Sequence, residues 1–212
     1  LAGFTWRPAA KLSLFMDFEK AVSDGSYFRT SLYDYSKLST RARYQVLSSV
    51  ALAANFSVLD NDNPAAGSTY NFENRNNSLT VFWTPSGGKR VSVTADYTRS
   101  TLVSEISYLV PQTLQPGRSY YAERAHTGTA VVDLALPNPG AGAPRLTLGG
   151  SLFVSSGTRP AEYYQPLVRL LAPLHKRVSL LGEWRWYGFG ETSYGYEAFR
   201  THHFIAGLRF SI

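Results

Sequence analysis

The residues best suited to chemistry are four histidines and a set of alternating charged side chains. His202 and His203 are adjacent, so in a strand they point to opposite faces and cannot both bind one metal ion. His126 near Glu123 is a loose candidate for a hydrolytic site, but the chain has no G-x-S-x-G, phosphate-loop or H-E-x-x-H motif. The absence of cysteine excludes thiol catalysis, disulfides, zinc–thiolate sites and covalent haem attachment. We therefore expect no catalytic residue, no metal site, no cofactor and no enzymatic activity.

The charged residues form a larger set, in which each member alternates along the chain with apolar neighbours. On the wall of a water-filled channel such ions stay hydrated and select solutes. Alternatively, oppositely charged neighbours on adjacent strands could form ladders that hold the wall together, and both roles remain open. We expect Arg169, Glu183, Arg185 and Arg209 to form one cluster, because they lie on three consecutive segments. The full set of lumen and selectivity candidates is Asp17, Glu19, Arg41, Arg43, Asp96, Asp133, Arg169, Glu183, Arg185, His203 and Arg209.

These side chains are positioned by segments in which apolar and polar residues alternate, the pattern of a β-strand with two different faces. In 178–188, for example, Val178, Leu180 and Trp184 share one face, whereas Glu183 and Arg185 share the other. About eleven such segments are predicted, near residues 1–6, 11–21, 38–47, 50–60, 76–84, 90–108, 119–136, 145–156, 163–171, 177–189 and 200–212. Most of them have about ten residues, which is typical of transmembrane β-strands and longer than most soluble strands.

The composition agrees with such a fold. Of 212 residues, 44% are hydrophobic and 14% aromatic, but only 17% are charged, well below the roughly 25% of an ordinary soluble domain. No run approaches the roughly 20 apolar residues of a membrane helix. The net charge of +6 is spread over turns, lumen and loops without a continuous basic stripe, so we expect no nucleic-acid partner. The fold class predicted is all-β, an antiparallel up-and-down transmembrane β-barrel with about 11–12 strands in this chain, and the alternative is a large soluble β-sandwich or barrel.

The connections between segments are also expected to alternate in length. Short turns are predicted at residues 7–10, 48–49, 85–89, 137–144 and 173–176, and longer polar stretches at 23–37, 60–75, 98–126, 157–162 and 190–200. Bacterial outer-membrane barrels have short periplasmic turns and longer outside loops. Pro166 is the one proline expected inside a strand, where it marks an edge, a bulge or a local break in pairing.

The last residues, Gly207, Leu208, Arg209, Phe210, Ser211 and Ile212, resemble the terminal strand of bacterial outer-membrane β-barrel proteins. In that family a glycine followed by alternating apolar residues is read by the barrel-assembly machinery. Gly207, Phe210 and Ile212 are therefore the expected assembly signal, with Ile212 standing where Phe or Trp is usual. The resemblance implies a Gram-negative outer-membrane location, outer-membrane lipid around the barrel, and passage of something through a lumen.

Two functions follow from this resemblance. The first is a porin or channel for passive passage of solutes or ions. The second is a scaffold barrel that sheathes a partner such as a multihaem cytochrome, so that electrons cross the membrane. A bacterial barrel normally starts in the periplasm with an even number of strands, whereas the segment near 1–6 runs downward from the outside. We therefore expect 1–212 to form one transmembrane domain that lacks its N-terminal strand or strands.

Overall fold

Eleven strands account for most of the chain in the computed structural model. It describes residues 1–23, 32–64, 69–85, 90–110, 112–137, 142–175, 177–191 and 199–210. The strands are β1 (Ala2–Ala9), β2 (Leu12–Val22), β3 (Asp34–Leu47), β4 (Val50–Asn63), β5 (Tyr70–Trp83), β6 (Val91–Leu109), β7 (Pro116–Ala135), β8 (Arg145–Gly157), β9 (Ala161–His175), β10 (Val178–Glu191) and β11 (Phe199–Phe210). None of the described residues forms a helix long and apolar enough to cross a membrane.

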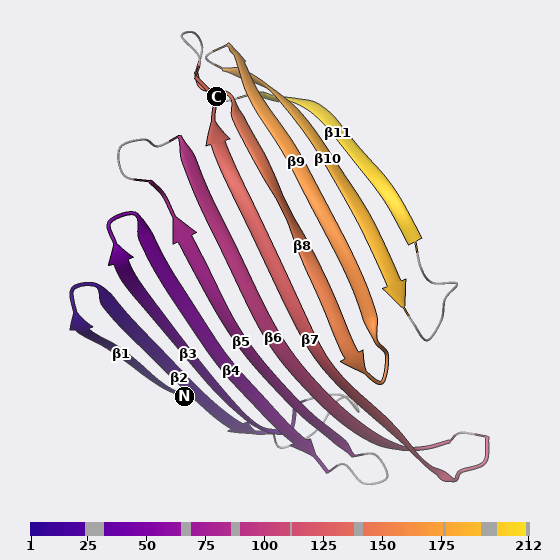
Figure 1. Ribbon diagram of the computed structural model, residues 1–212. Coiled ribbons are helices and arrows are strands. Elements are labelled where there is room, and N and C mark those ends of the chain that lie inside the picture. The colour runs from indigo at the N-terminus through magenta and orange to yellow at the C-terminus, as the bar shows by residue number, and fades with distance from the viewer. Residues whose placement is uncertain are drawn as a thin grey trace.

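All eleven strands belong to one sheet, in which each strand pairs antiparallel with its neighbours in the sequence. Figure 1 shows this sheet strongly curved, with β1 at one edge and β11 at the other. The predicted all-β, antiparallel, up-and-down fold is thereby confirmed. Because the strand number is odd, β1 and β11 run in the same direction, and the described residues show no ladder between them.

Several strands extend beyond the segments predicted from alternation. β5 begins at Tyr70 rather than near residue 76. In residues 70–75 the aromatic Tyr70 and Phe72 lie on the concave face and the polar residues between them on the convex face, which reverses the pattern of residues 79–83. The polar stretch 98–126, expected to be a long connection, is mostly strand, and only residues 110–115 connect β6 to β7. The strict alternation of short and long connections was wrong, since residues 136–144 form a longer connection than residues 158–160.

Prolines lie where strand pairing is irregular. On β9, Leu167 pairs with Arg185 of β10 and Tyr164 pairs with Gly188. Between these two pairs, at Pro166, the ladder is interrupted, but the register of the two strands does not change. This confirms the predicted local break, because proline has no amide hydrogen for the ladder. The expectation that no other proline lies inside a strand was wrong: Pro8 lies in β1 and Pro173 in β9. Pro8 lies within a register irregularity of β1, and Pro173 borders another between β9 and β10.

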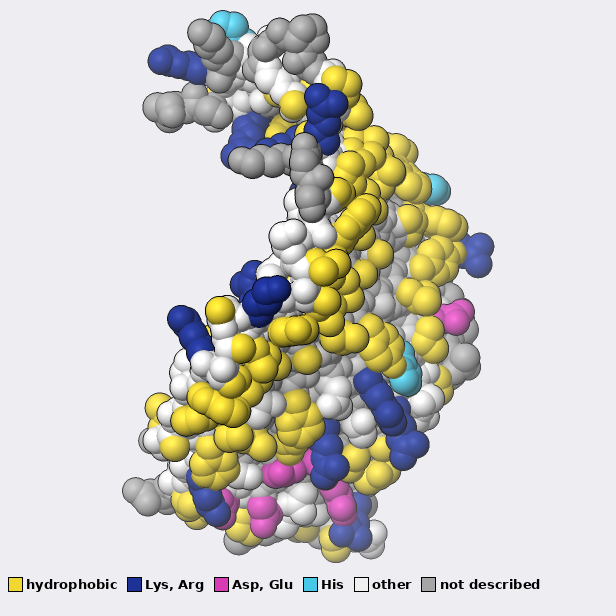
Figure 2. All heavy atoms as spheres, turned by 60° about the vertical axis from the view of Figure 1, so that its left-hand side comes forward, with side chains coloured by type: hydrophobic (Ala, Val, Ile, Leu, Met, Phe, Trp, Pro, Cys, Tyr) yellow, Lys and Arg dark blue, Asp and Glu magenta, His cyan; other side chains and the backbone are white. Residues whose placement is uncertain are grey.

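The two faces of the sheet differ in chemistry. Side chains on a concave face converge and bury one another, whereas those on a convex face diverge. Among the described residues other than glycine, the six that are almost fully buried all project from one face, which identifies it as the concave face: Ala51, Asn61, Asn63, Ala125, Ser155 and Glu183. Figure 2 shows hydrophobic side chains in a broad band over the outward-curving surface and polar and basic side chains around the hollow.

Candidate functional site: the polar concave face

All eleven residues predicted to line a lumen project from the concave face of the sheet. The pairing of the strands fixes their relative positions. Asp17 on β2 lies diagonally across from Arg41 on β3, and Glu183 on β10 lies directly opposite Arg169 on β9. They comprise five arginines, five carboxylates and one histidine. The concave face is therefore lined by charges of both signs.

Glu183 is the centre of the strongest interaction on this face. Its side chain is only 4% exposed, and its Oε2 accepts a hydrogen bond from Nε of Arg169 at 2.6 Å. The other carboxylate oxygen, Oε1, is ion-paired with Nε of Arg185, which in turn donates from Nη1 to the hydroxyl of Tyr187 at 3.4 Å. One buried carboxylate thus joins two guanidinium groups from adjacent strands, which offsets the cost of removing these charges from water.

Arg209 does not belong to this cluster, and the prediction of four clustered residues was wrong in this respect. On β11 the residue opposite Glu183 is Ile205, and the residue opposite Arg185 is His203. Arg209 stands opposite Ser179, nearer the C-terminal end of β11. The sequence alone could not reveal this, because the register between two strands depends on the connection of residues 192–198.

Four more of the predicted carboxylates on the concave face have partners on neighbouring strands. The hydroxyl of Thr147 donates to Asp133 at 2.5 Å, and that of Thr80 donates to Asp96 at 2.7 Å. Tyr35 donates to Glu19 at 2.6 Å, and Arg41 lies 3.9 Å from Asp17 in an exposed ion pair. Each of these four carboxylates therefore joins two adjacent strands, but only Asp17 does so through an oppositely charged partner of the kind that the ladder hypothesis describes.

Three cationic or potentially cationic side chains differ from these carboxylates. Arg43, His203 and Arg209 are exposed and form no ion pair with any residue in the described ranges. They stand where a solute in the hollow could reach them. The selectivity hypothesis therefore applies best to these residues, whereas the ladder hypothesis applies best to the carboxylates.

Further charged residues on the concave face lie outside the predicted set. Lys37 stands opposite Glu19 on the next strand, Arg145 stands opposite Leu171, and Glu123 stands opposite Gly157. Lys37 and Arg145 lie near the predicted ends of their segments, where the alternation is harder to follow. Continuing the period of two through those ends would have found both of them.

The histidines show how alternation separates neighbouring side chains. As predicted, His202 and His203 lie on opposite faces, and His202 stacks on Trp186 with ring centroids 5.7 Å apart. His126 and Glu123 also lie on opposite faces of β7, so the loose hydrolytic pair is not assembled. His126 instead contacts the hydroxyl of Tyr97 through Nδ1 at 2.6 Å on the convex face.

The convex face carries an apolar belt. We define it as the first residue and every second residue after it in the following ranges: 2–6, 12–18, 38–44, 50–58, 79–83, 91–97, 128–134, 146–154, 164–172, 178–188 and 204–210. None of these positions carries a charged side chain. Many of its large side chains are open to the surroundings, including Phe204 at 73% exposed and Phe4 at 59%. This surface is far larger than the apolar patches that soluble monomers expose.

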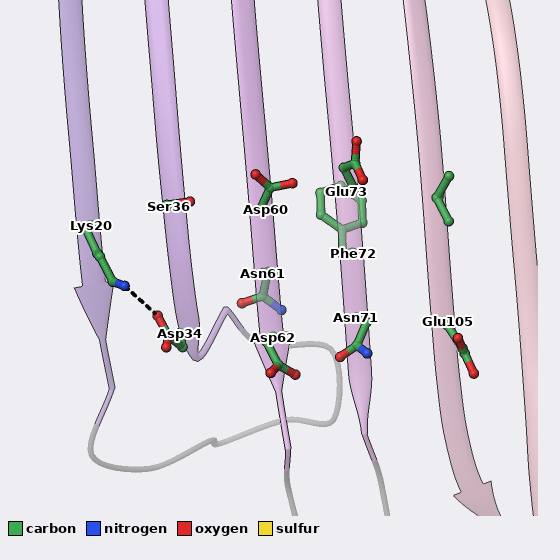
Figure 3. Close-up of a pocket in the computed structure, with 11 residues that line it drawn as sticks. Lys20, Asp34, Ser36, Asp60, Asn61, Asp62, Asn71, Phe72, Glu73 and Glu105 are labelled. Atoms are coloured by element: carbon green, nitrogen blue, oxygen red, sulfur yellow. Dashed lines mark ion pairs between the residues drawn. The ribbon is translucent and has the colours of Figure 1, made fainter.

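Beyond the belt, toward the β2–β3 and β4–β5 connections, the convex face becomes polar. Five carboxylates lie there around an open depression of about 420 Å³: Asp34, Asp60, Asp62, Glu73 and Glu105. Figure 3 shows them in a row across β3 to β6, with Lys20 of β2 paired to Asp34 at 3.9 Å. Within the described ranges, no group of three or more His, Asp or Glu side chains is arranged to hold a metal ion.

No protein-family model matches the chain, and no curated protein matches its sequence. The outer-membrane resemblance thus depends on the chain's own residues. Of the predicted assembly signal, Gly207 faces the concave side and Phe210 the convex side of β11, whereas Ile212 lies outside the described residues.

Proposed function

We propose that this protein is an outer-membrane β-barrel channel that lets solutes or ions pass through a polar lumen. The observation that carries the proposal is the apolar belt on the convex face. A surface of this kind is stable when hydrocarbon covers it, because the exposed apolar side chains then leave water. The barrel-assembly machinery that reads terminal strands and the surrounding outer-membrane lipid are the partners expected for such a protein.

The height of the belt supports the same proposal. On the convex face of β2, β6 and β7, the first charged or imidazole side chain lies eight residues from the belt residue at the short-turn end of the strand. The pairs are Leu12 and Lys20, Val91 and Arg99, and Leu134 and His126. On β4 the corresponding step, from Val50 to Asp60, is ten residues. At about 3.3 Å per residue and a tilt of about 40°, eight to ten residues span roughly 20–25 Å, close to the apolar band of outer-membrane barrels.

The concave face supports the idea of a lumen. It carries both signs of charge and many hydroxyl and amide side chains, which would keep an enclosed space hydrated. Passage through such a space is passive, and the mixture of side chains sets which solutes enter. Since β1 and β11 run in the same direction, a closed antiparallel barrel needs an odd number of further strands between them.

Conductance and membrane partition together test this function. Full-length protein should float with lipid vesicles after an alkaline wash and should conduct ions when it is added to a planar bilayer. Extraction without detergent would contradict the membrane location, and vesicle insertion without conductance would contradict the channel. Co-purification of a red, haem-absorbing protein with a non-conducting barrel would favour the sheath around a multihaem cytochrome.

A further inference from the structure

A group of basic residues adjoins the apolar belt on β5, β6 and β7. We call Arg75, Arg99, Arg124 and His126 the basic patch. All four are exposed and lie on the convex face. In Figure 2 dark-blue and cyan side chains lie along the lower edge of the yellow band.

The register brings these side chains close together. Arg75 and Arg124 both stand opposite Thr101, one on each side of β6. Arg99 lies two residues from Thr101 on the same face, directly opposite His126. Because adjacent strands are about 4.8 Å apart, the Cα atoms of Arg75 and Arg124 are roughly 10 Å apart. Long arginine side chains can therefore converge on one anionic group.

The charges of the patch are only partly balanced within the described residues. Arg75 is ion-paired with Glu73 on its own strand. By contrast, Arg99 and Arg124 form no ion pair with any residue in the parts of the chain that are described. Like charges at this spacing repel one another, and the repulsion grows beside an apolar surface that excludes water. An anion bound between them would remove this repulsion.

We propose that the basic patch binds the phosphate of an anionic lipid headgroup. Arginine matches phosphate geometry with two parallel hydrogen bonds. The patch also lies one belt height from the short-turn ends of its strands, with Arg75 eight residues from Trp83 and Arg99 eight from Val91. That is the level at which headgroup phosphates meet a barrel whose belt is covered by acyl chains.

Neighbouring residues favour this lipid over a free anion. Tyr97, the last belt residue of β6, is 48% exposed and holds His126 through Nδ1, so that an acyl chain and a headgroup could be contacted together. The carboxylates Glu73 and Glu105 lie farther from the belt than the patch. They would repel a phosphate that moved outward, which confines the headgroup to the level of the arginines.

This inference depends on the proposed membrane location, and its test separates the two. Full-length protein is folded in maltoside micelles, which contain no phosphate, and phosphatidylglycerol is titrated in. Native mass spectrometry then counts the bound lipid. We expect R99Q/R124Q to retain phosphatidylglycerol roughly tenfold more weakly than the unchanged protein. R99K/R124K, which keeps the charge but loses the two-point geometry, should be intermediate.

The matched control is Arg200→Gln. Arg200 lies on the convex face of β11, opposite Gly188 and beyond the belt, but outside the basic patch. It should bind lipid as the unchanged protein does. Equal retention in R99Q/R124Q and the unchanged protein would overturn the inference, as would retention of an uncharged diacylglycerol equal to that of phosphatidylglycerol. Displacement of the lipid by equimolar inorganic phosphate would also overturn it, because the site would then recognise a free ion.

Insertion is measured on the same samples. Flotation with phosphatidylcholine vesicles, with no anionic lipid present, reports the membrane location alone. A protein that inserts but shows no preference for phosphatidylglycerol would contradict the lipid site and leave the channel proposal standing. A protein that does not insert would contradict both. Capture of an acidic protein by the patch in place of lipid would also overturn the inference.

Discussion

Glu183 on β10 accepts a hydrogen bond from Arg169 on β9 at 2.6 Å while its side chain is almost fully buried. The same carboxylate holds Arg185. By comparison, the pair of Asp17 and Arg41 on β2 and β3 is open to solvent, with side chains 55% and 65% exposed. On this face the described residues therefore include ion pairs with a buried carboxylate and an ion pair between two exposed side chains, and these should differ in their contribution to stability.

Replacing Glu183 with alanine should destabilise the sheet. The two guanidinium groups lose their common acceptor, and we expect a loss of about 1–3 kcal/mol in the free energy of unfolding. Glu183→Gln should cost less, since it keeps one oxygen acceptor. Urea unfolding in lipid vesicles, followed by tryptophan fluorescence, measures the difference.

Asp17→Ala is the control for that substitution, because it breaks an exposed pair with a 3.9 Å separation. It should change the free energy of unfolding by about 0–1 kcal/mol. Equal effects of Glu183→Ala and Asp17→Ala would show that burial of the carboxylate is unimportant for stability.

Arg209→Ala and Arg185→Ala should differ in their effects on stability and on ion selectivity. Arg209 has no ion-pair partner among the described residues, so its loss should leave the free energy of unfolding within about 0.5 kcal/mol of that of the unchanged protein. If the protein conducts ions through the hollow, the same loss should shift its ion selectivity toward cations. Arg185 is held by Glu183 and Tyr187, and its loss should destabilise by about 1–2 kcal/mol. Reversal potentials in a salt gradient, together with urea unfolding, test both. An unchanged reversal potential for Arg209→Ala would exclude it from the conduction path.

The strands and faces could be predicted because both depend on a period of two. Alternation located all eleven strands, and it assigned Asp96 and Arg169 to the same face although they lie on distant strands. The place of Arg209 relative to Glu183 could not be predicted, because it depends on strand register. The polar end of the convex face, with Asp60 and Glu73, was missed for a different reason: the convex face changes from apolar to polar there, while apolar residues such as Phe72 lie on the concave face.

Gly157 at the end of β8 should not tolerate a side chain. Its φ is +130°, and an added Cβ would lie 2.0 Å from the carbonyl oxygen of Ala122 on β7. Gly157→Ala should therefore separate the ends of β7 and β8 and cost about 1–3 kcal/mol of stability. Gly128→Ala is the control, because a Cβ there meets no atom within 4 Å. Urea unfolding of both variants measures the difference, and a loss as large for Gly128→Ala would rule out this steric explanation.

A charge in the apolar belt should prevent membrane insertion, whereas the same charge one residue away should not. Leu152 on β8 is 54% exposed on the convex face, and Ser151 faces the hollow. If hydrocarbon covers the belt, Leu152→Arg should cost about 2 kcal/mol of folding free energy in bilayers, because a guanidinium group is poorly solvated there. Ser151→Arg adds the same side chain to the hydrated face and should insert normally. Folding yield in phosphatidylcholine vesicles, measured by flotation and protease protection, distinguishes the two variants. If Leu152→Arg and Ser151→Arg inserted equally well, the belt would not be a lipid-facing surface.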